Sequence, residues 1–486
     1  MALCKRLIGR LDIKGSRLIK GIRFEGLRVL GDPAESALRY YKAGADELLY
    51  LDVVASLYGR NGLADLLRST SRNVFIPVTA GGGIRSVDDA KSLLSAGADK
   101  IAINTAALQR PELITELASS FGKQCVVASI QARRTGSGTW EAMSNAGRER
   151  SGEDVLSWIQ KVQQLGAGEI LLSSIDQDGT CLGPDHELLV AASEIAQVPL
   201  VFSGGFASED QVLQALQLPA VSGVSLGAAV HKNRLNFGDL KQQLVDASAT
   251  LPIRVPSLSS QIQLVDNSGP LVGKLIGIVD YGMGNQQSLY NAFEHLGADV
   301  SLSAEPGFLQ KCDLLALPGV GSFPKGMAEL QHSGLDCFLR DWVISGHPLL
   351  GICLGMQMMF EAGEEFGCTT GLGFFKGHVL PLATHDDTGK KLVKPHMGWN
   401  RLIPGEAWHQ SFKSVSFNQY FVHSYAATGI DPKYVLFYCR YGHEPFVAAV
   451  SHGVVAGFQF HPERSGMDGL ELLAAVCGQL LSSKAD

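Results

Sequence analysis

The chain has 486 residues, 45% of them hydrophobic and 18% charged, which is long enough for two or three domains with full hydrophobic cores. Its formal net charge of -7 gives no basic footprint, which argues against nucleic acid or an anionic membrane surface as a partner. No apolar run approaches the roughly 18 to 20 residues of a membrane span and "MALCKRLIGR" lacks a signal-peptide core, so we expect a cytoplasmic protein.

Over residues 1–245, short apolar or β-branched runs alternate with amphipathic segments of helix length. The eight runs are LIGRLDI (7–13), ELLYLDV (47–53), FIPVTA (75–80), KIAIN (100–104), CVVASI (125–130), EILLSSI (169–175), PLVFSGG (199–205) and GVSLG (223–227). Eight β/α units in this length predict an N-terminal (β/α)8 TIM barrel, in which active-site residues follow the ends of strands.

An internal repeat supports the eight-strand interpretation. The segment "AGADELLYLDV" (43–53) is echoed by "LGAGEILLSSID" (165–176), and "VTAGGGIRSVDDAKSLLSAGA" (78–98) is echoed by "VFSGGFASEDQVLQALQLPA" (201–220). Both echoes have nearly the same offset, so the sequence predicts two similar half-barrels.

Glycine and small residues gather where the predicted strands end. These turns read GGGI (81–84), INTAA (103–107), DQDGT (176–180), SGGF (203–206) and LGAAVHK (226–232). Such turns let backbone N–H groups approach phosphate oxygens, and they fall into both halves of the repeat. We therefore expect two phosphate sites for one ligand with a phosphate at each end, although barrel turns also use glycine without any ligand.

After the barrel, proline, serine and polar residues interrupt the periodicity over 246–273, which predicts a linker. From "LIGIVDYGMGN" the β/α alternation resumes, so we expect a second α/β domain over 274–486.

The nine cysteines lack C-x-x-C spacing, which indicates reduced thiols rather than disulfides or a zinc site. One of them, Cys353 in "HPLLGICLGMQMMFEAGEE" (347–365), stands between a short apolar run and a helix-like segment. A helix N-terminus favours a thiolate there, and the alternative is a buried structural cysteine. Further on, "VVAGFQFHPERSG" delivers His461 and Glu463, whose i, i+2 spacing in an extended segment lets the carboxylate orient the imidazole.

The second domain resembles the class I glutamine amidotransferases, and in particular the glutaminase subunits of imidazole glycerol phosphate synthases. The matching motifs are DYGMGN (280–285), LPGVGSF (317–323), GICLGMQ (351–357), PHMGWN (395–400), YFVHSYA (420–426) and FHPE (460–463). The resemblance implies that Cys353 attacks the carboxamide of glutamine, His461 transfers the proton and Glu463 holds the histidine. It further implies an oxyanion site and a glutamine site, formed by Gly319, Val320 and Leu354 and by Gln357 and Glu365, respectively.

The first domain resembles the cyclase subunits of the same synthases, through GRLDIKGSRLIKG (9–21), GGGIRS (81–86), INTAA (103–107), GAGEIL (166–171) and SIDQDGT (174–180). The resemblance implies Asp12 as a catalytic acid or base, with Lys20 on the loop after it. Its implied phosphate and substrate residues are Gly83, Asn104, Thr105, Gln131, Asp178, Gly179, Gly205 and Gly227. Its implied ammonia entrance is a ring of Arg6, Glu47, Lys100 and Glu169, which could alternatively be surface ion pairs.

The sequence departs from the cyclase pattern at Gln131, where the family has a second catalytic aspartate. Glutamine forms hydrogen bonds but does not titrate, so it cannot act as a general acid or base. Ala228 also stands where the family often has a hydroxyl, and the cyclase-like domain precedes the glutaminase-like one, the reverse of the order expected in fused synthases.

The resemblance therefore predicts a glutamine-dependent imidazole glycerol phosphate synthase in one chain, with no separate glutaminase subunit. Its substrates would be glutamine and a bis-phosphate ribonucleotide, phosphoribulosyl-formimino-AICAR phosphate, and no metal or organic cofactor is implied. The alternative is a paralogue whose glutaminase supplies ammonia to another acceptor or a partner enzyme, and Gln131 favours it. A non-catalytic scaffold does not fit the intact set of Cys353, His461 and Glu463.

Overall fold

The computed structural model describes residues 3–55, 63–256, 269, 271–389, 391–408 and 417–482. These form two compact units, and Leu3–Pro256 with the short segment Val393–Gly398 make up the first. The second contains the remaining described residues from 269 onward. Residues 257–268 and 270 of the predicted linker, 246–273, lie outside the described residues, and the domain boundaries at 245 and 274 stay predictions.

Eight parallel strands close into a barrel in the first unit, because β1 pairs with both β4 and β12 while β7 pairs with β10. The strands are β1 Arg6–Lys14, β4 Glu47–Asp52, β5 Val78–Gly81, β6 Lys100–Ile103, β7 Val126–Gly136, β10 Glu169–Ser174, β11 Leu200–Ser203 and β12 Val221–Leu226. Each of the eight predicted runs overlaps one of these strands, which confirms the TIM barrel.

The barrel interior is layered because alternate residues of each strand point inward. Along β1, Arg6, Ile8, Arg10 and Asp12 share one face. The middle layer is apolar and consists of Ile8, Leu49, Ala102, Val127, Leu171 and Val201, one residue from each of six strands. Charged and polar side chains therefore occupy both ends of the barrel, with an apolar layer between them.

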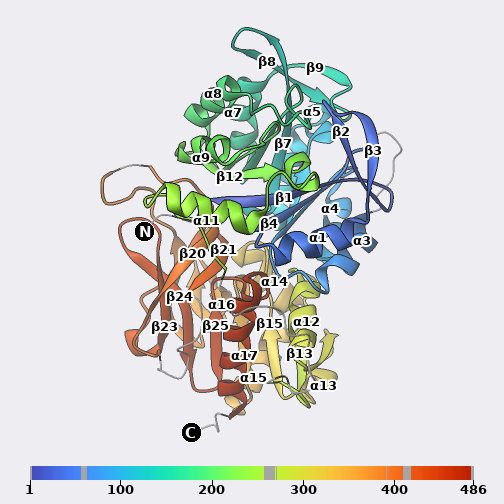
Figure 1. The fold of residues 1–486 in the computed structure, drawn as a ribbon. Helices are drawn as coiled ribbons and strands as arrows, with labels where there is room; N and C mark the ends of the chain where they lie inside the picture. Colours follow the sequence, from blue (N-terminus) through green and yellow to red (C-terminus); the bar gives the residue numbers. More distant parts are fainter. Residues whose placement is uncertain are drawn as a thin grey trace. The chain divides into compact units, whose positions relative to one another are not determined.

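Amphipathic helices cover the outside of the barrel (Figure 1). They are α1 Pro33–Lys42, α3 Leu63–Ser71, α4 Val87–Ser95, α5 Thr105–Gln109, α6 Glu112–Phe121, α7 Val155–Leu165, α8 His186–Ile195, α9 Glu209–Gln217, α10 Ala228–His231 and α11 Phe237–Ala247. In α7, for example, Val155, Trp158, Ile159 and Val162 are buried at helical spacing. Helix α4 begins with a capping box formed by Ser86 and Asp89.

Two antiparallel hairpins that the sequence did not predict extend from the barrel strands. The first, β2 Arg17–Ile22 and β3 Glu25–Gly31, continues from β1. The second, β8 Thr139–Ser144 and β9 Glu149–Asp154, continues from β7. Both hairpins follow strands that carry candidate site residues.

The second unit contains a nine-stranded mixed sheet in the order β14-β13-β15-β16-β25-β24-β23-β20-β21. Its strands are β13 Leu275–Val279, β14 Asp299–Ser303, β15 Leu314–Leu317, β16 Leu349–Ile352, β20 His396–Pro404, β21 Asn418–His423, β23 Val435–Arg440, β24 Pro445–His452 and β25 Val455–Phe458. Residues 396–398, at the start of β20, fall in the short segment that belongs to the first unit. A smaller sheet contains β17 Phe360–Gly363, β18 Thr369–Thr370, β19 Phe375–Pro381 and β22 Tyr425–Thr428.

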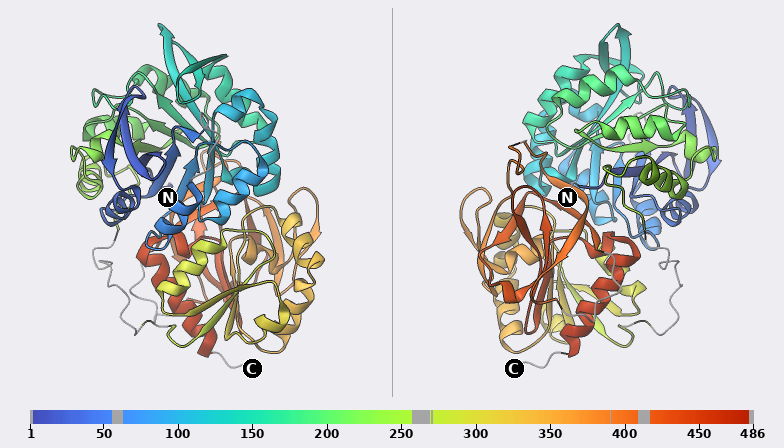
Figure 2. Two further views of the ribbon diagram at one scale, coloured as in Figure 1. Left: turned by 90° about the vertical axis from the view of Figure 1, so that its right-hand side faces the viewer. Right: turned by 60° about the vertical axis from the view of Figure 1, so that its left-hand side comes forward.

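Helices flank the larger sheet on both faces, with α12 and α17 on one side and α14 and α15 on the other (Figure 2). The helices of this unit are α12 Gln286–His295, α13 Pro306–Leu309, α14 Phe323–His332, α15 Leu335–Ile344, α16 Leu354–Met358 and α17 Gly466–Ser482. This arrangement confirms the predicted α/β class of the second domain. Among the described residues, no helix combines the length and apolarity needed to cross a membrane.

Candidate active sites

A tight turn between β16 and α16 carries the candidate nucleophile. Cys353 has φ 52° and ψ −108°, a conformation that non-glycine residues rarely adopt. Its N–H donates to Phe458 O at 2.6 Å, and its carbonyl accepts from Gln357 N at 3.0 Å. Strained backbone of this kind is held by its surroundings and often marks functional sites. The thiol therefore lies at the N-terminus of α16, as the sequence predicted, although only 6% of the residue is exposed.

His461 lies beyond the end of the neighbouring parallel strand, β25, and is oriented by a carboxylate. Its Nδ1 lies 2.7 Å from Glu463 Oε1. Burial alone would lower the pKa of His461, but Glu463 and the Cys353 sulfur raise that pKa well above the usual value. Among the described residues, His461 Nε2 has no hydrogen-bond partner, so it remains available to a reacting group. The structure thus brings the three predicted triad residues together.

The predicted oxyanion residues meet at the start of α16. A Cβ atom added to Gly319 would lie 2.6 Å from Leu354 Cβ and 2.7 Å from Gly355 N, so only glycine allows this close approach. The preceding carbonyl, Pro318 O, accepts a 2.7 Å hydrogen bond from the Tyr281 hydroxyl. Val320 follows directly and is partly exposed.

The two predicted glutamine-binding side chains have different surroundings. Gln357 Nε2 donates to Tyr425 O at 2.9 Å and to Gln459 Oε1 at 3.0 Å. Glu365 Oε2 accepts from Phe323 N at 2.8 Å, and burial raises the pKa of Glu365. Both amide hydrogens of Gln357 are therefore used, which leaves its Oε1 for a ligand.

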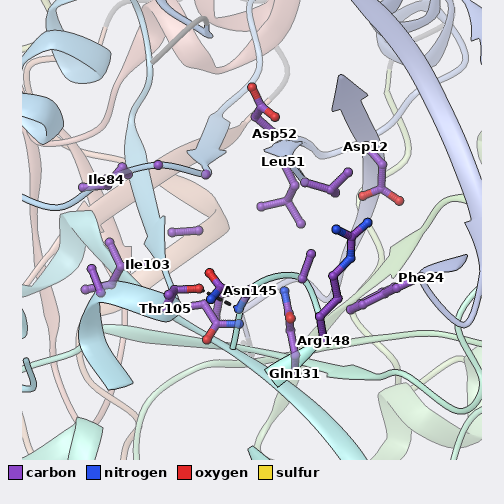
Figure 3. Close-up of a pocket in the computed structure, with 18 of the residues that line it drawn as sticks. Asp12, Phe24, Leu51, Asp52, Ile84, Ile103, Thr105, Gln131, Asn145 and Arg148 are labelled. Carbon is purple, nitrogen blue, oxygen red and sulfur yellow. Dashed lines mark hydrogen bonds between the residues drawn. The ribbon is translucent and has the colours of Figure 1, made fainter. Parts of the chain in front are cut away.

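A cavity of about 230 Å³ opens at the C-terminal ends of the barrel strands (Figure 3). Asp12 lies at one side of it, paired with Arg10 Nε at 2.8 Å and Lys20 Nζ at 2.6 Å. Both cations also contact Asp178, at 3.3 Å from Arg10 Nη1 and 2.8 Å from Lys20 Nζ. Burial alone would raise the pKa of Asp12, but Arg10 and Lys20 outweigh it and hold that pKa well below its usual value. Asp12 is therefore a carboxylate at neutral pH.

Gln131 extends from β7 into the same cavity, which Arg148 also lines (Figure 3). Neither side chain hydrogen-bonds to any other residue in the described part of the chain, and Gln131 Oε1 is buried. The Asn104 side chain supplies a second buried acceptor, Oδ1, which has no hydrogen-bond partner among the described residues. The Nδ2 atom of the same side chain donates to Met143 O at 3.2 Å. The cavity thus offers two amide acceptors and a cation to a ligand.

The two predicted phosphate sites have matching backbone geometry. Gly82 and Gly83 have φ of 113° and 75°, and Gly204 and Gly205, which follow at the repeat offset, have 111° and 89°. The N-cap of α5, Asn104, has φ −130° and ψ −84°, and that of α10, Gly227, has −120° and −85°. The sequence repeat therefore corresponds to a repeat of backbone conformation at both sites. Thr105 Oγ1, at the first site, accepts from Asn145 N at 2.9 Å.

Lys20 and the first hairpin lie over the second site. A Cβ atom added to Gly227 would lie 3.6 Å from Lys20 Nζ, and one added to Gly179 would lie 2.2 Å from Gly21 O. Arg23 N donates to Asp178 O at 2.8 Å, which holds the hairpin in place.

The four residues of the predicted ammonia entrance form a closed ring at the opposite end of the barrel. Arg6 pairs with Glu47 at 2.8 Å and with Glu169, and Lys100 pairs with both glutamates at 2.6 Å. All four residues are at most 2% exposed, so they are not surface ion pairs. Met397, in the short segment that belongs to this unit, has its sulfur 3.7 Å from Lys100 Nζ. Within the described residues, no group of three or more His, Cys, Asp or Glu side chains could hold a metal ion.

Three residues at these sites were not predicted from the sequence. Arg10 stands two residues before Asp12 on the same strand, so its i, i+2 spacing was a usable signal. Gln459 stands two residues before His461 and offered the same signal. Arg148 reaches the cavity from the turn between β8 and β9, and nothing in the sequence indicated that hairpin.

Comparisons with known proteins agree with this division of the chain. Residues 6–236 match the family described as "Histidine biosynthesis protein", and residues 277–475 match "Glutamine amidotransferase class-I". A similar curated protein is imidazole glycerol phosphate synthase subunit HisF of Legionella pneumophila, 58% identical over 200 residues, which are 41% of this chain and 94% of the relative. The subunit HisF of Streptococcus sanguinis is 41% identical over 253 residues, 52% of this chain and all of the relative. That of Synechococcus sp. is 44% identical over 250 residues, 51% of this chain and 98% of the relative.

Proposed function

This chain belongs to the histidine biosynthesis protein family through its barrel and matches the class I glutamine amidotransferases in its second domain, and on that premise we propose that it is a glutamine-dependent imidazole glycerol phosphate synthase. Ammonia released from glutamine in the second domain would convert phosphoribulosyl-formimino-AICAR phosphate in the barrel. The products would be imidazole glycerol phosphate and AICAR. The observation that carries the proposal is that one chain combines the Cys353, His461 and Glu463 site with a barrel that has two glycine turns of matching backbone conformation.

In the glutaminase half, the thiolate of Cys353 attacks the carboxamide carbon of glutamine. Main-chain N–H groups near Gly319 and Leu354 stabilise the oxyanion, and His461 gives its proton to the leaving nitrogen, which departs as ammonia. Water, activated by His461, then hydrolyses the thioester to glutamate, which restores the thiolate and leaves His461 protonated. The raised pKa of His461 supports this sequence, because the imidazole must be protonated when ammonia leaves.

In the barrel, the two phosphates of the substrate bind at Gly83, Asn104 and Thr105 and at Gly179, Gly205 and Gly227. The matching backbone angles of Gly82 and Gly83 with Gly204 and Gly205 support this pairing. Lys20 stands at the second site and supplies a cation to the phosphate there. A ligand held at both ends lies across the cavity lined by Asp12 and Gln131.

We propose that ammonia enters through the ring of Arg6, Glu47, Lys100 and Glu169. The apolar layer between this ring and the cavity supports such a route, because ammonia is neutral and crosses apolar surroundings at lower cost than an ion does. The ring is closed in this structure, so a lysine or arginine side chain has to move for passage.

The comparisons do not favour the alternative of a paralogue with another acceptor, since the similar curated proteins are synthase subunits. The discriminating experiment supplies glutamine and the bis-phosphate substrate to the full chain. We expect glutamate and imidazole glycerol phosphate in equal amounts. Glutamate release without any consumption of the bis-phosphate would contradict the proposal and support the alternative.

A further inference from the structure

Gln459 lies beside the sulfur of the candidate nucleophile. Strands β16 and β25 pair in parallel, with Ile352 opposite Phe458, so the next residues, Cys353 and Gln459, leave the sheet at the same level. Gln459 is fully buried, and its Nε2 lies 3.7 Å from Cys353 Sγ.

A chain of hydrogen bonds determines which end of the Gln459 amide faces the sulfur. Tyr425 O is a main-chain carbonyl and can only accept, so the Gln357 atom 2.9 Å away must be its amide nitrogen. The second hydrogen of that nitrogen is donated to Gln459 Oε1 at 3.0 Å. With its oxygen turned to Gln357, Gln459 presents its N–H group to Cys353.

We propose that Gln459 is a positioning residue whose amide N–H group holds the Cys353 sulfur as a thiolate at the glutaminase site, an inference that rests on the proposed role of Cys353 as the nucleophile. An N–H donor stabilises the thiolate more than the neutral thiol, because a hydrogen bond is stronger when its acceptor is charged. The Gln459 amide therefore favours the ionised form of the sulfur, and the sulfur is in turn one of the groups that raise the pKa of His461. Gln357 acts on the sulfur through Gln459, by keeping the amide in this orientation.

The pH dependence of Cys353 alkylation in the full chain tests this role. Gln459→Glu keeps an acceptor for Gln357 but replaces the donor at the sulfur by a carboxylate oxygen. Iodoacetamide is the probe, and peptide mass spectrometry isolates Cys353 from the other cysteines. We expect the midpoint of alkylation to rise by on the order of one pH unit in Gln459→Glu. Gln459→Met, which removes the donor without adding a charge, is expected to raise the midpoint by a smaller amount.

Asn400→Asp is the matched control, because it also places a carboxylate at a buried amide of the same sheet. Asn400 lies on β20, which β24 and β23 separate from β25. In Asn400→Asp, the midpoint of Cys353 alkylation is expected to equal that of the parent. Thermal unfolding of all variants identifies any effect of a damaged fold.

Steady-state glutamine hydrolysis gives a second readout. In both Gln459 variants we expect kcat to fall and KM for glutamine to stay within about twofold of the parent value, because the thiolate acts after binding. The proposal is overturned if folded Gln459→Glu and Gln459→Met are alkylated with the midpoint of the parent. A different outcome is that both Gln459 variants show the expected shifts while the parent hydrolyses no glutamine. This outcome would contradict the proposed function and leave the role of Gln459 intact.

Discussion

The carboxylate of Asp12, which the family resemblance implies as a catalytic acid or base, forms ion pairs with two buried cations, Arg10 and Lys20. An aspartate whose pKa is held this low does not donate a proton at neutral pH in this state of the protein. It can accept a proton or stabilise a cationic intermediate. Because Gln131 does not titrate, we expect the proton transfers of the proposed reaction to fall to Asp12, although Asp52 and Asp178 also line the cavity.

Asp12→Asn is therefore expected to lower ammonia-dependent turnover of the bis-phosphate by at least about 10²-fold, the usual contribution of a general acid or base. The change also breaks two buried ion pairs, so stability has to be measured alongside activity. Asp46→Asn is the matched control, because Asp46 is equally buried and paired, with Lys241 and Arg254, but does not line the cavity. Turnover by folded Asp12→Asn at the rate of Asp46→Asn would exclude a chemical role for Asp12.

Cys353→Ala is expected to abolish glutamate release, because no other thiol is held beside His461 at the end of β16. Binding of glutamine itself should change little, since the residues that contact its amino acid end are untouched. Glutamate formation and calorimetric binding of glutamine are measured on the same preparation. Hydrolysis by the variant at near the parent rate would show that the nucleophile is another group.

Among the turns that follow the barrel strands, the glycines of the proposed second phosphate site are not equivalent as probes. A Cβ atom at Gly205 would lie 1.9 Å from Gly183 O, and its φ of 89° strains any side chain. At Gly227 φ is −120° and the nearest atom would be 3.6 Å away. Replacing Gly205 therefore tests the stability of the fold, and replacing Gly227 tests the binding of the ligand.

Gly227→Ala is expected to raise KM for the bis-phosphate by roughly 10- to 100-fold, because the added methyl group displaces the phosphate from the main-chain N–H groups. Its unfolding temperature should equal that of the parent. Gly205→Ala, in contrast, should unfold at a lower temperature because of backbone strain. An unchanged KM in Gly227→Ala would remove the second phosphate site from the account.

The strands and the repeat were predictable from sequence because buried parallel strands read as short apolar runs at regular spacing. The paired angles of Gly82 with Gly204 show that even local conformation follows the repeat. The β2–β3 and β8–β9 hairpins were not predictable in this way, because one strand of each, β3 and β9, has no buried residue and therefore no burial pattern. Arg148 reaches the cavity from one of these hairpins, so its place in the site could not be inferred.

The candidate site was predictable where chemistry follows a strand end, as at Cys353 and His461. It was not predictable where the function of a residue depends on partners distant in sequence. Lys20 meets Asp178 across 158 positions, and Gln357 meets Gln459 across 102. Only the fold reveals that the amide of Gln357 faces Gln459 and that Asp12 is ion-paired.

For the whole molecule, acid is expected to destabilise both domains over the same pH range. Burial lowers the pKa of His231 in the barrel and of His423 in the second domain to about 4. Between that value and the pKa of about 6.5 in the unfolded chain, only the unfolded state binds these protons. Each histidine therefore costs its domain up to roughly 3 kcal/mol of stability as the pH falls from 6.5 to 4.

Calorimetric unfolding between pH 4 and 7.5 measures this loss, and each domain can give its own transition. His231→Gln should flatten the pH dependence of the barrel transition only, and His423→Gln that of the other domain. Equal pH dependence in parent and variants would show that these histidines do not remain neutral in the folded state.

Turnover of phosphoribulosyl-formimino-AICAR phosphate with ammonium salt in place of glutamine is the decisive measurement for the proposed synthase. This assay bypasses the glutaminase and asks whether the barrel completes the reaction with Gln131 in its cavity. We expect the parent and Cys353→Ala to form imidazole glycerol phosphate at the same rate. Neither protein should need the Gln131→Asp substitution for this turnover. No product from the parent at any ammonium concentration, with product appearing only in Gln131→Asp, would contradict the synthase assignment.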